Sequence, residues 1–322
     1  MGAEAFVSVV IPTHGRRSLL ERTLASLVGQ DYPSSSMEVV VVDDASPDDT
    51  PSFLEAFSPP WRLVTRRHAE NLGRSAARNT GLEAASGDVV VFIDDDMRCV
   101  SDLVSRHVAC LASHSNTVAV GTALSDPALG RSTVASFYDG MGVHRLAPGS
   151  AIPARYFVTN NAAVPRAALD AAGGFDPAFS CYGFEDCELA FRMEDAGFAF
   201  RHCPGAVAYH MEAMTLEGFL ARREEATRAI AAILAKHPHR ARDIPASVLL
   251  PPAPADPASL RARKILLRVL TASPFCRLVR GAASAFWWRS LSVPVVTYLV
   301  ACGYRRGLAD VLREGPPDAP NV

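Results

Sequence analysis

The sequence predicts an α/β fold, a doubly wound, mostly parallel sheet with flanking helices, followed by a helical C-terminal extension. Short runs rich in valine and isoleucine alternate with helix-like stretches through the first hundred residues. The run at residues 89–93 is continuously apolar, as expected of a strand buried on both faces. Basic helix-like stretches follow a proline-rich segment near residue 250.

The first hundred residues alternate strand and helix in a regular order. We expect strand 7–11, helix 18–28, strand 39–42, helix 49–57, strand 63–65, helix 75–85 and strand 89–93. Such alternation builds parallel strands, and ligands bind beyond the carboxyl ends of such strands, where the loops meet. Asp43 and Asp44 follow one of these strands, and three aspartates follow another, so five carboxylates meet at one edge.

The second half of the chain is less regular. Residues 102–153 predict a helix followed by mixed strand and loop, with no legible chemical motif. The later elements are a strand-like stretch at 157–165, a helix from Arg166, a glycine turn at 173–176, a helix that carries Glu185 and Asp186, a short strand that ends at His210, and a charged helix up to Lys236.

Proline marks a domain boundary in this chain. Five prolines fall among small residues between positions 245 and 257, which disfavours regular structure. We therefore expect a catalytic domain at residues 1–243, a proline-rich linker at 244–258 and a basic helical region at 259–322.

The composition excludes some partners and leaves others open. With 322 residues, a formal net charge of -2 and 49% hydrophobic residues, the chain is neither disordered nor globally basic, so we expect no nucleic-acid partner. The region after Glu217 is basic, which indicates either a solvated helical face or a peripheral contact with an anionic membrane. The apolar stretch 286–304 is interrupted by Arg289 and Pro294, so it does not predict a spanning helix. Its aromatic residues, Trp287 and Trp288, suit either a membrane interface or packing.

Cysteine usage predicts the compartment. Seven cysteines without a CxxC pair indicate neither a disulfide framework nor a cysteine zinc site, and the N-terminus lacks a signal-like segment. We expect a cytoplasmic protein, held at the inner membrane face if the basic region binds lipid.

The triplet Asp94-Asp95-Asp96 is the clearest chemical signal. Alternate residues of an extended segment point the same way, so Asp94 and Asp96 can share one Mg²⁺ or Mn²⁺ ion while Asp95 faces elsewhere. A solvated acidic turn is the plain alternative. A haloacid dehalogenase phosphatase also ends a strand with DxD, but this chain has Arg98 where such enzymes carry threonine or valine.

Three further motifs are ambiguous alone. Asp43 and Asp44 suit either a helix-capping turn or a nucleoside pocket. Glu185 and Asp186 suit either the start of a helix or a general base. His210 is either structural or a third metal ligand.

Together these motifs resemble the family-two inverting glycosyltransferases with the A-type nucleotide-sugar fold. The resemblance covers residues 6–236 and rests on VSVVIPTHGR, VVDDASPDDT, NLGRSAARNTGLEAASGDVVVFIDDDM, GGFD and YGFEDCELAFRM, which occur in the family's order.

The resemblance assigns roles to individual residues. It implies nucleotide contacts, a DxD metal site with a late histidine, a base supported by a neighbouring acid, and contacts with the donor sugar or acceptor. The implied residues are Thr13, Asp43, Asp44, Arg74, Arg78 and Asp95 for the nucleotide; Asp94, Asp96 and His210 for the metal; Asp186 as base with Glu185; and Asn161, Gly174 and Phe175 for donor sugar or acceptor.

The resemblance also predicts the reaction. The chain lacks the QxxRW element of processive synthases, so we expect transfer of a single sugar, from a UDP-sugar by family habit, to an unidentified hydroxyl. No GxGxxG or GxxxxGK element supports a dehydrogenase or a P-loop enzyme. The alternatives are the phosphatase above and a catalytically inactive nucleotide-sugar-binding relative.

Overall fold

The computed structural model describes residues 5–130, 132–140, 142–179, 182–252, 256–272, 274, 276–279 and 293–314. The chain divides into two compact units. The sheet unit comprises Met1–Leu129, Asp139–Ser180 and Glu185–Ala213, and the helical unit comprises Gly130–Tyr138, Cys181–Phe184 and Met214–Val322.

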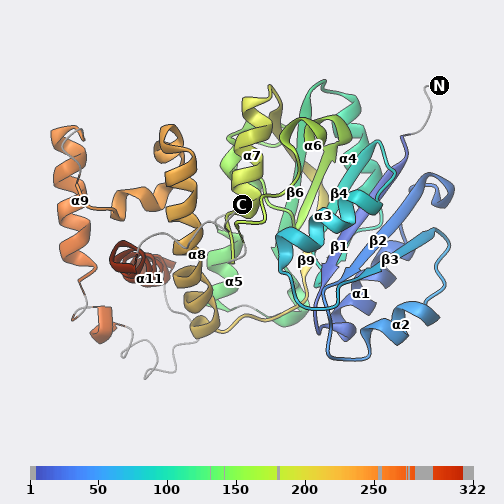
Figure 1. Cartoon of the computed structure of the whole chain (residues 1–322), viewed down its shortest axis with the longest axis horizontal. Coiled ribbons are helices and arrows are strands. Elements are labelled where there is room, and N and C mark those ends of the chain that lie inside the picture. Colours follow the sequence, from blue (N-terminus) through green and yellow to red (C-terminus); the bar gives the residue numbers. More distant parts are fainter. Residues whose placement is uncertain are drawn as a thin grey trace. The chain divides into compact units, whose positions relative to one another are not determined.

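One nine-stranded sheet forms the centre of the sheet unit (Figure 1). Its strands run in the order β3-β2-β1-β4-β8-β6-β9-β5, and β7 pairs with β9. The strands are β1 (Val7–Thr13), β2 (Met37–Asp43), β3 (Arg62–Arg67), β4 (Val89–Ile93), β5 (Met97–Cys99), β6 (Thr117–Ser125), β7 (Ala151–Ile152), β8 (Asn161–Pro165) and β9 (Ala199–His210).

Helices cover both faces of this sheet. They are α1 (Arg17–Val28), α2 (Thr50–Ala56), α3 (Arg74–Ala84), α4 (Leu103–Ala112), α6 (Arg166–Ala172) and α7 (Glu185–Asp195), with the 3₁₀ turns η1 (Ser34–Ser36), η2 (Pro127–Leu129), η3 (Val143–Arg145) and η4 (Ala154–Tyr156). Leu20 and Leu24 of α1 pack on the face that carries Val9. On the other face α3 comes so close to β1 that a Cβ on Gly81 would lie 2.5 Å from Val10 Cγ1.

The predicted doubly wound sheet with flanking helices is confirmed, and its second half is mixed. Strands β3, β2, β1 and β4 are parallel, whereas β8 runs antiparallel to both β4 and β6. The chain passes from β1 to β2 and β3 on one side and then returns to β4 on the other. The gap beyond β1 and β4 is therefore the switch point where ligands bind in sheets of this kind.

The helical unit has a core of its own. It contains α5 (Thr133–Asp139, which ends in the sheet unit), α8 (Leu216–Lys236), η5 (Pro238–Asp243), η6 (Pro245–Leu249), α9 (Ala258–Leu270) and α11 (Val293–Glu314). Phe137 meets Phe219 edge to face at 5.5 Å, and Val296, Leu299 and Val300 complete this core. The predicted helical C-terminal region is thus confirmed. The predicted boundaries at 243 and 258 remain a proposal, because they divide the chain by composition and the units divide it by packing.

Three sequence expectations concern this unit. Cys276 and Cys302 form a disulfide, which the sequence analysis did not predict, since it indicated no disulfide framework. The pairing depends on how distant helices pack, which cysteine spacing does not reveal. Within the described ranges, none of the helices has the length and apolar character needed to span a bilayer. Trp287 and Trp288, predicted to suit a membrane interface or packing, lie outside those ranges.

Candidate functional site

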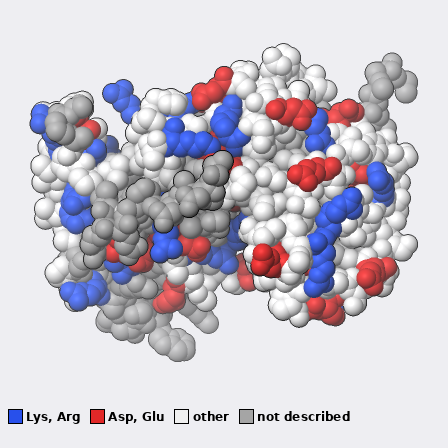
Figure 2. Space-filling view, viewed as in Figure 1, with Lys and Arg blue, Asp and Glu red and all other residues white. Residues whose placement is uncertain are grey.

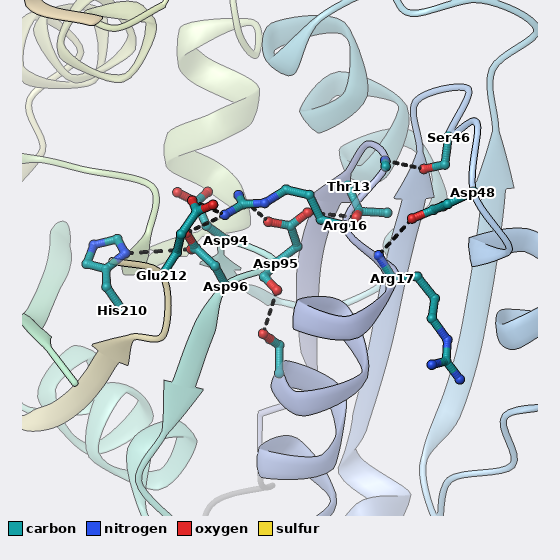
Figure 3. Close-up of polar contacts among 12 residues, drawn as sticks. Thr13, Arg16, Arg17, Ser46, Asp48, Asp94, Asp95, Asp96, His210 and Glu212 are labelled. Carbon is teal, nitrogen blue, oxygen red and sulfur yellow. Dashed lines mark hydrogen bonds and ion pairs between the residues drawn. The ribbon is translucent and has the colours of Figure 1, made fainter. Parts of the chain in front are cut away.

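Thr13 and Asp95 join the carboxyl ends of β1 and β4 at the switch point (Figure 3). The Thr13 hydroxyl donates a 2.7 Å hydrogen bond to Asp95 Oδ2, and both side chains are buried. Burial outweighs the attraction of nearby Arg16 and raises the pKa of the Asp95 carboxyl to about 7. Asp95 thus faces the first strand and holds the two strand ends together, and its predicted contact with the nucleotide remains a proposal.

Asp96 and His210 meet at the same edge from different strands. β5 pairs antiparallel with the end of β9, so Met97 lies opposite His210, and the Met211 N–H donates to the Asp96 carbonyl at 2.8 Å. His210 Nδ1 consequently lies 3.6 Å from Asp96 Oδ1 (Figure 3). Burial alone would raise the pKa of Asp96, but His210 and Arg16 outweigh it and hold that pKa well below its usual range.

Arg16 is a site residue that the sequence analysis missed. Its guanidinium forms ion pairs with Asp95 at 2.9 Å, Asp96 at 3.0 Å and Glu212 at 2.6 Å (Figure 3). Its position after the first strand was the available signal, because clustered carboxylates need a nearby cation. Arg16 therefore brings one positive charge to these carboxylates, whereas a divalent metal ion bound there would bring two.

Arg78 connects the aspartate triplet to the start of α7. Nη2 lies 3.0 Å from Asp94 Oδ1, Nη1 lies 2.8 Å from Glu185 Oε1, and the arginine is only 2% exposed. The guanidinium carbon also lies 5.6 Å from the centre of the Phe175 ring. The structure therefore brings Asp94 and Glu185, 91 positions apart in the chain, onto one cation.

Asp186 follows Glu185 in the first turn of α7. Burial and the neighbouring Glu185 carboxylate raise the pKa of Asp186 to about 7, although Arg78 opposes this rise. A carboxyl with that pKa exchanges a proton near neutral pH, as a general base must. Glu185 Oε2 is buried and has no hydrogen-bond partner among the described residues.

Asp43 and Asp44 lie at the end of β2 and hold neighbouring loops. Asp44 accepts hydrogen bonds from the N–H groups of Leu72 and Gly73, each at 2.8 Å, and contacts His68 Nδ1 at 2.7 Å. Asp43 accepts from the Ser46 N–H at 2.8 Å and pairs with an arginine of β3. These carboxylates therefore fix the loops that follow β2, beside the switch point. Their predicted contact with a nucleoside remains a proposal.

Arg74, also predicted to contact the nucleotide, is the first residue of α3. It follows Gly73, whose φ of +85° only glycine adopts readily. The loop that Asp44 holds therefore delivers Arg74 to the start of the helix that also carries Arg78. The predicted contact of Arg74 with the base or phosphates also remains a proposal.

The three residues predicted for donor sugar or acceptor serve the fold in this structure. Asn161 is fully buried: His107 contacts its Oδ1 at 2.8 Å, and its Nδ2 donates to two backbone carbonyls. Gly174 has φ of +74°, and Phe175 is buried against Phe92. Asn161 thus gives the predicted site no free polar atom, because alternation along β8 turns it into the core.

Asn160, the preceding residue, contacts a predicted site residue, whereas Asn161 does not. Its Nδ2 lies 3.2 Å from His210 Nε2, and its Oδ1 is buried with no hydrogen-bond partner within the described part of the chain. The sequence NN gave no means of choosing between the two asparagines, because the register of the strand decides which one faces the site.

The comparisons with known proteins establish the family. Residues 89–304 match the glycosyl transferase family group 2, and residues 8–137 match glycosyl transferase family 2. The chain belongs to glycosyl transferase family 2. The fold of this family member resembles that of a mannosyltransferase from Pyrobaculum calidifontis solved with GDP-Man and Mn²⁺, with a TM-score of 0.64 and 23% identity over 98% of this chain and 89% of that one.

Two more similar proteins complete the comparison. Staphylococcus aureus TarS 1-349, solved with UDP-GlcNAc, gives a TM-score of 0.52 and 20% identity over 96% of this chain and 92% of that one. The uncharacterized glycosyltransferase YfnE of Bacillus subtilis is 28% identical over 260 residues, 64% of each chain. The family member spans 64% of the length of YfnE and 16% of the length of the glycosyltransferase GlyA of Streptococcus pneumoniae.

Proposed function

We propose that this chain is a metal-dependent, inverting glycosyltransferase that moves one sugar from a nucleoside diphosphate sugar to an acceptor hydroxyl. The ion pairs of buried Arg78 with Asp94 and Glu185 carry the proposal, because they bring the acidic edge of the sheet and the start of α7 to one place. In the proposed reaction the donor diphosphate binds at the acidic edge, and the base that accepts the acceptor proton lies at the start of α7.

Asp186 is the proposed base. In the reaction the acceptor oxygen bonds to the anomeric carbon, the bond from that carbon to the diphosphate breaks, and Asp186 takes the hydroxyl proton. One displacement from the face opposite the diphosphate inverts the configuration. The raised pKa of about 7 suits this transfer, and Glu185 supports it by keeping Arg78 in place.

The donor atoms of Asp96 and His210 suit two ligands of one divalent ion, and Asp94, which pairs with Arg78, is the proposed third ligand. Two ligands of one Mn²⁺ or Mg²⁺ ion lie about 3 Å apart, since each sits about 2.1 Å from the metal. The 3.6 Å between Asp96 Oδ1 and His210 Nδ1 is close to that value, and carboxylate with imidazole suits Mn²⁺. Bound there, the metal would neutralise charge that develops on the departing diphosphate.

The donor is proposed to be a UDP-sugar. TarS was solved with UDP-GlcNAc and the Pyrobaculum enzyme with GDP-Man, so both nucleotides occur on this fold. Asp43, Asp44, Arg74 and Thr13 lie around the switch point where a base and ribose bind in such sheets. The haloacid dehalogenase alternative has no support, because the family is a glycosyltransferase family.

Isothermal titration against UDP-, GDP- and dTDP-sugars, with manganese, magnesium or chelator, tests this proposal. We expect binding of one nucleotide class that chelator abolishes, followed by release of the nucleoside diphosphate when an acceptor is supplied. Metal-independent binding would contradict the metal role alone. Donor binding without turnover on any acceptor would favour the inactive relative, and binding of no nucleotide sugar would overturn the proposal.

A further inference from the structure

The outward face of α9 is apolar along its centre. Ile265, Leu266, Val269 and Leu270 expose 54%, 57%, 66% and 47% of their surface. At about 3.6 residues per turn these four side chains lie within an arc of about 140°. A surface helix normally turns such an arc toward a core, so this helix shows solvent the face that most helices hide.

Arginines border that apolar arc. Arg261 lies at one edge and Arg263 at the other by the same helical spacing, and both are exposed. No acidic residue occurs within α9. Residues 257–314 contain ten lysines and arginines against two acids, so the charge around this helix is positive. Figure 2 shows basic residues beside uncharged surface in the region where Figure 1 places α9.

The opposite face of α9 is fixed within the helical unit. Lys264 is 8% exposed and pairs with Asp256 at 2.8 Å. Arg305 of α11 donates to the Arg268 carbonyl at 2.5 Å, and the Tyr298 hydroxyl donates to the Leu270 carbonyl at 2.9 Å. These contacts hold the helix with its apolar arc outward.

We propose that α9 docks on an anionic lipid surface. Ile265, Leu266, Val269 and Leu270 would enter the boundary between headgroups and acyl chains, and Arg261 and Arg263 would contact lipid phosphates on either side. A second copy of the chain fits less well, because two such faces would bring arginines against arginines. The proposal does not depend on the chemistry of the sheet unit.

Co-sedimentation of the full chain with vesicles tests this docking. We expect binding to phosphatidylcholine vesicles that contain phosphatidylglycerol, weakening as salt rises, and little binding to pure phosphatidylcholine. Val269→Glu should lower the partition coefficient about tenfold or more. Arg261→Gln and Arg263→Gln should each lower it about fivefold, about 1 kcal/mol. Val28→Glu on α1, 43% exposed, is the matched control and should bind as the wild type does.

Each other outcome overturns the proposal. Absence of binding, or equal binding to neutral and anionic vesicles, excludes an anionic lipid partner. A large loss of Tm in Val269→Glu would show that this face is packed within the folded chain. A dimer in sedimentation velocity that Val269→Glu dissolves would identify a second copy as the partner. Transfer to a water-soluble acceptor should be unchanged in all these variants, so failure here is distinguishable from failure of the proposed reaction.

Discussion

His210 Nδ1 lies 3.6 Å from Asp96 Oδ1, although 114 positions separate the two residues. The antiparallel pairing of β5 with β9 causes this approach, because it sets Met97 opposite His210. Arg16 also pairs with Asp96, with Nη2 lying 3.0 Å from Asp96 Oδ2. A divalent ion at this place would therefore compete with Arg16 for the same carboxylate.

Asp96→Asn should abolish metal-dependent donor binding. The substitution removes the negative charge that attracts both the metal and Arg16, and we expect turnover to fall at least about 100-fold. Titration of the donor with and without manganese measures the effect. Asp170→Asn, on an exposed position of α6, is the matched control and should behave as the wild type. Retained metal-dependent binding in Asp96→Asn would remove Asp96 from the metal site.

Arg16→Gln should tighten metal binding in the absence of donor. Without its guanidinium, Asp95, Asp96 and Glu212 lose a shared cation, so a metal ion meets less competition and more uncompensated negative charge. We expect the dissociation constant for Mn²⁺ to fall several-fold, measured by titration calorimetry of the donor-free protein. Arg17→Gln, whose side chain pairs with Glu21, is the control. Weaker metal binding in Arg16→Gln would show that Arg16 organises the ligands instead.

The rate of transfer should depend on the ionisation of Asp186. A carboxyl accepts a proton only when it is ionised, so kcat/KM should rise about tenfold per pH unit below about 7 and level off above it. Asp186→Asn should lose about 10² to 10⁴-fold in rate, lose this pH limb and still bind donor. Asp95 also has a pKa of about 7 but faces Thr13, so Asp95→Asn should keep the limb. An unchanged profile in Asp186→Asn would exclude it as the base.

Arg78→Met should destabilise the sheet unit as well as stop transfer. It leaves Glu185 buried without its cation, which typically costs about 3–5 kcal/mol, or a Tm loss on the order of 10 °C. Adding Glu185→Gln should restore part of the Tm by removing the unpaired charge, but not the activity. Thermal unfolding and donor turnover of both variants measure this. A single variant with wild-type Tm would show that the ion pairs are not formed.

The sequence predicted the first half of the sheet well because its signals are local. The runs that became β2 and β4 are apolar and lead into aspartates, so their order predicted that Asp43 and Asp94 lie at one edge. Arg16 and Arg78 were harder. The roles of both depend on which carboxylates the folded chain brings near them, and sequence spacing does not report those distances.

The second half was less predictable for a similar reason. Strands β6, β8 and β9 pair across long separations in both directions, so their register cannot be read from any one segment. That register decides that Asn161 faces His107 while Asn160 faces His210. The disulfide between Cys276 and Cys302 escaped prediction because these cysteines, 26 positions apart, meet only through the packing of the folded chain.

The adjacent asparagines of this register form a natural pair of test and control. Asn161→Ala should lower the free energy of unfolding by about 1–3 kcal/mol, because it leaves His107 and two buried carbonyls without their partner. Asn160→Ala should leave the Tm nearly unchanged and lower turnover, because it removes the contact to His210 Nε2, beside Asp96. Thermal unfolding and donor turnover of the two variants separate the roles. Loss of turnover with wild-type Tm in Asn161→Ala would instead return Asn161 to the site, where the family resemblance had placed it.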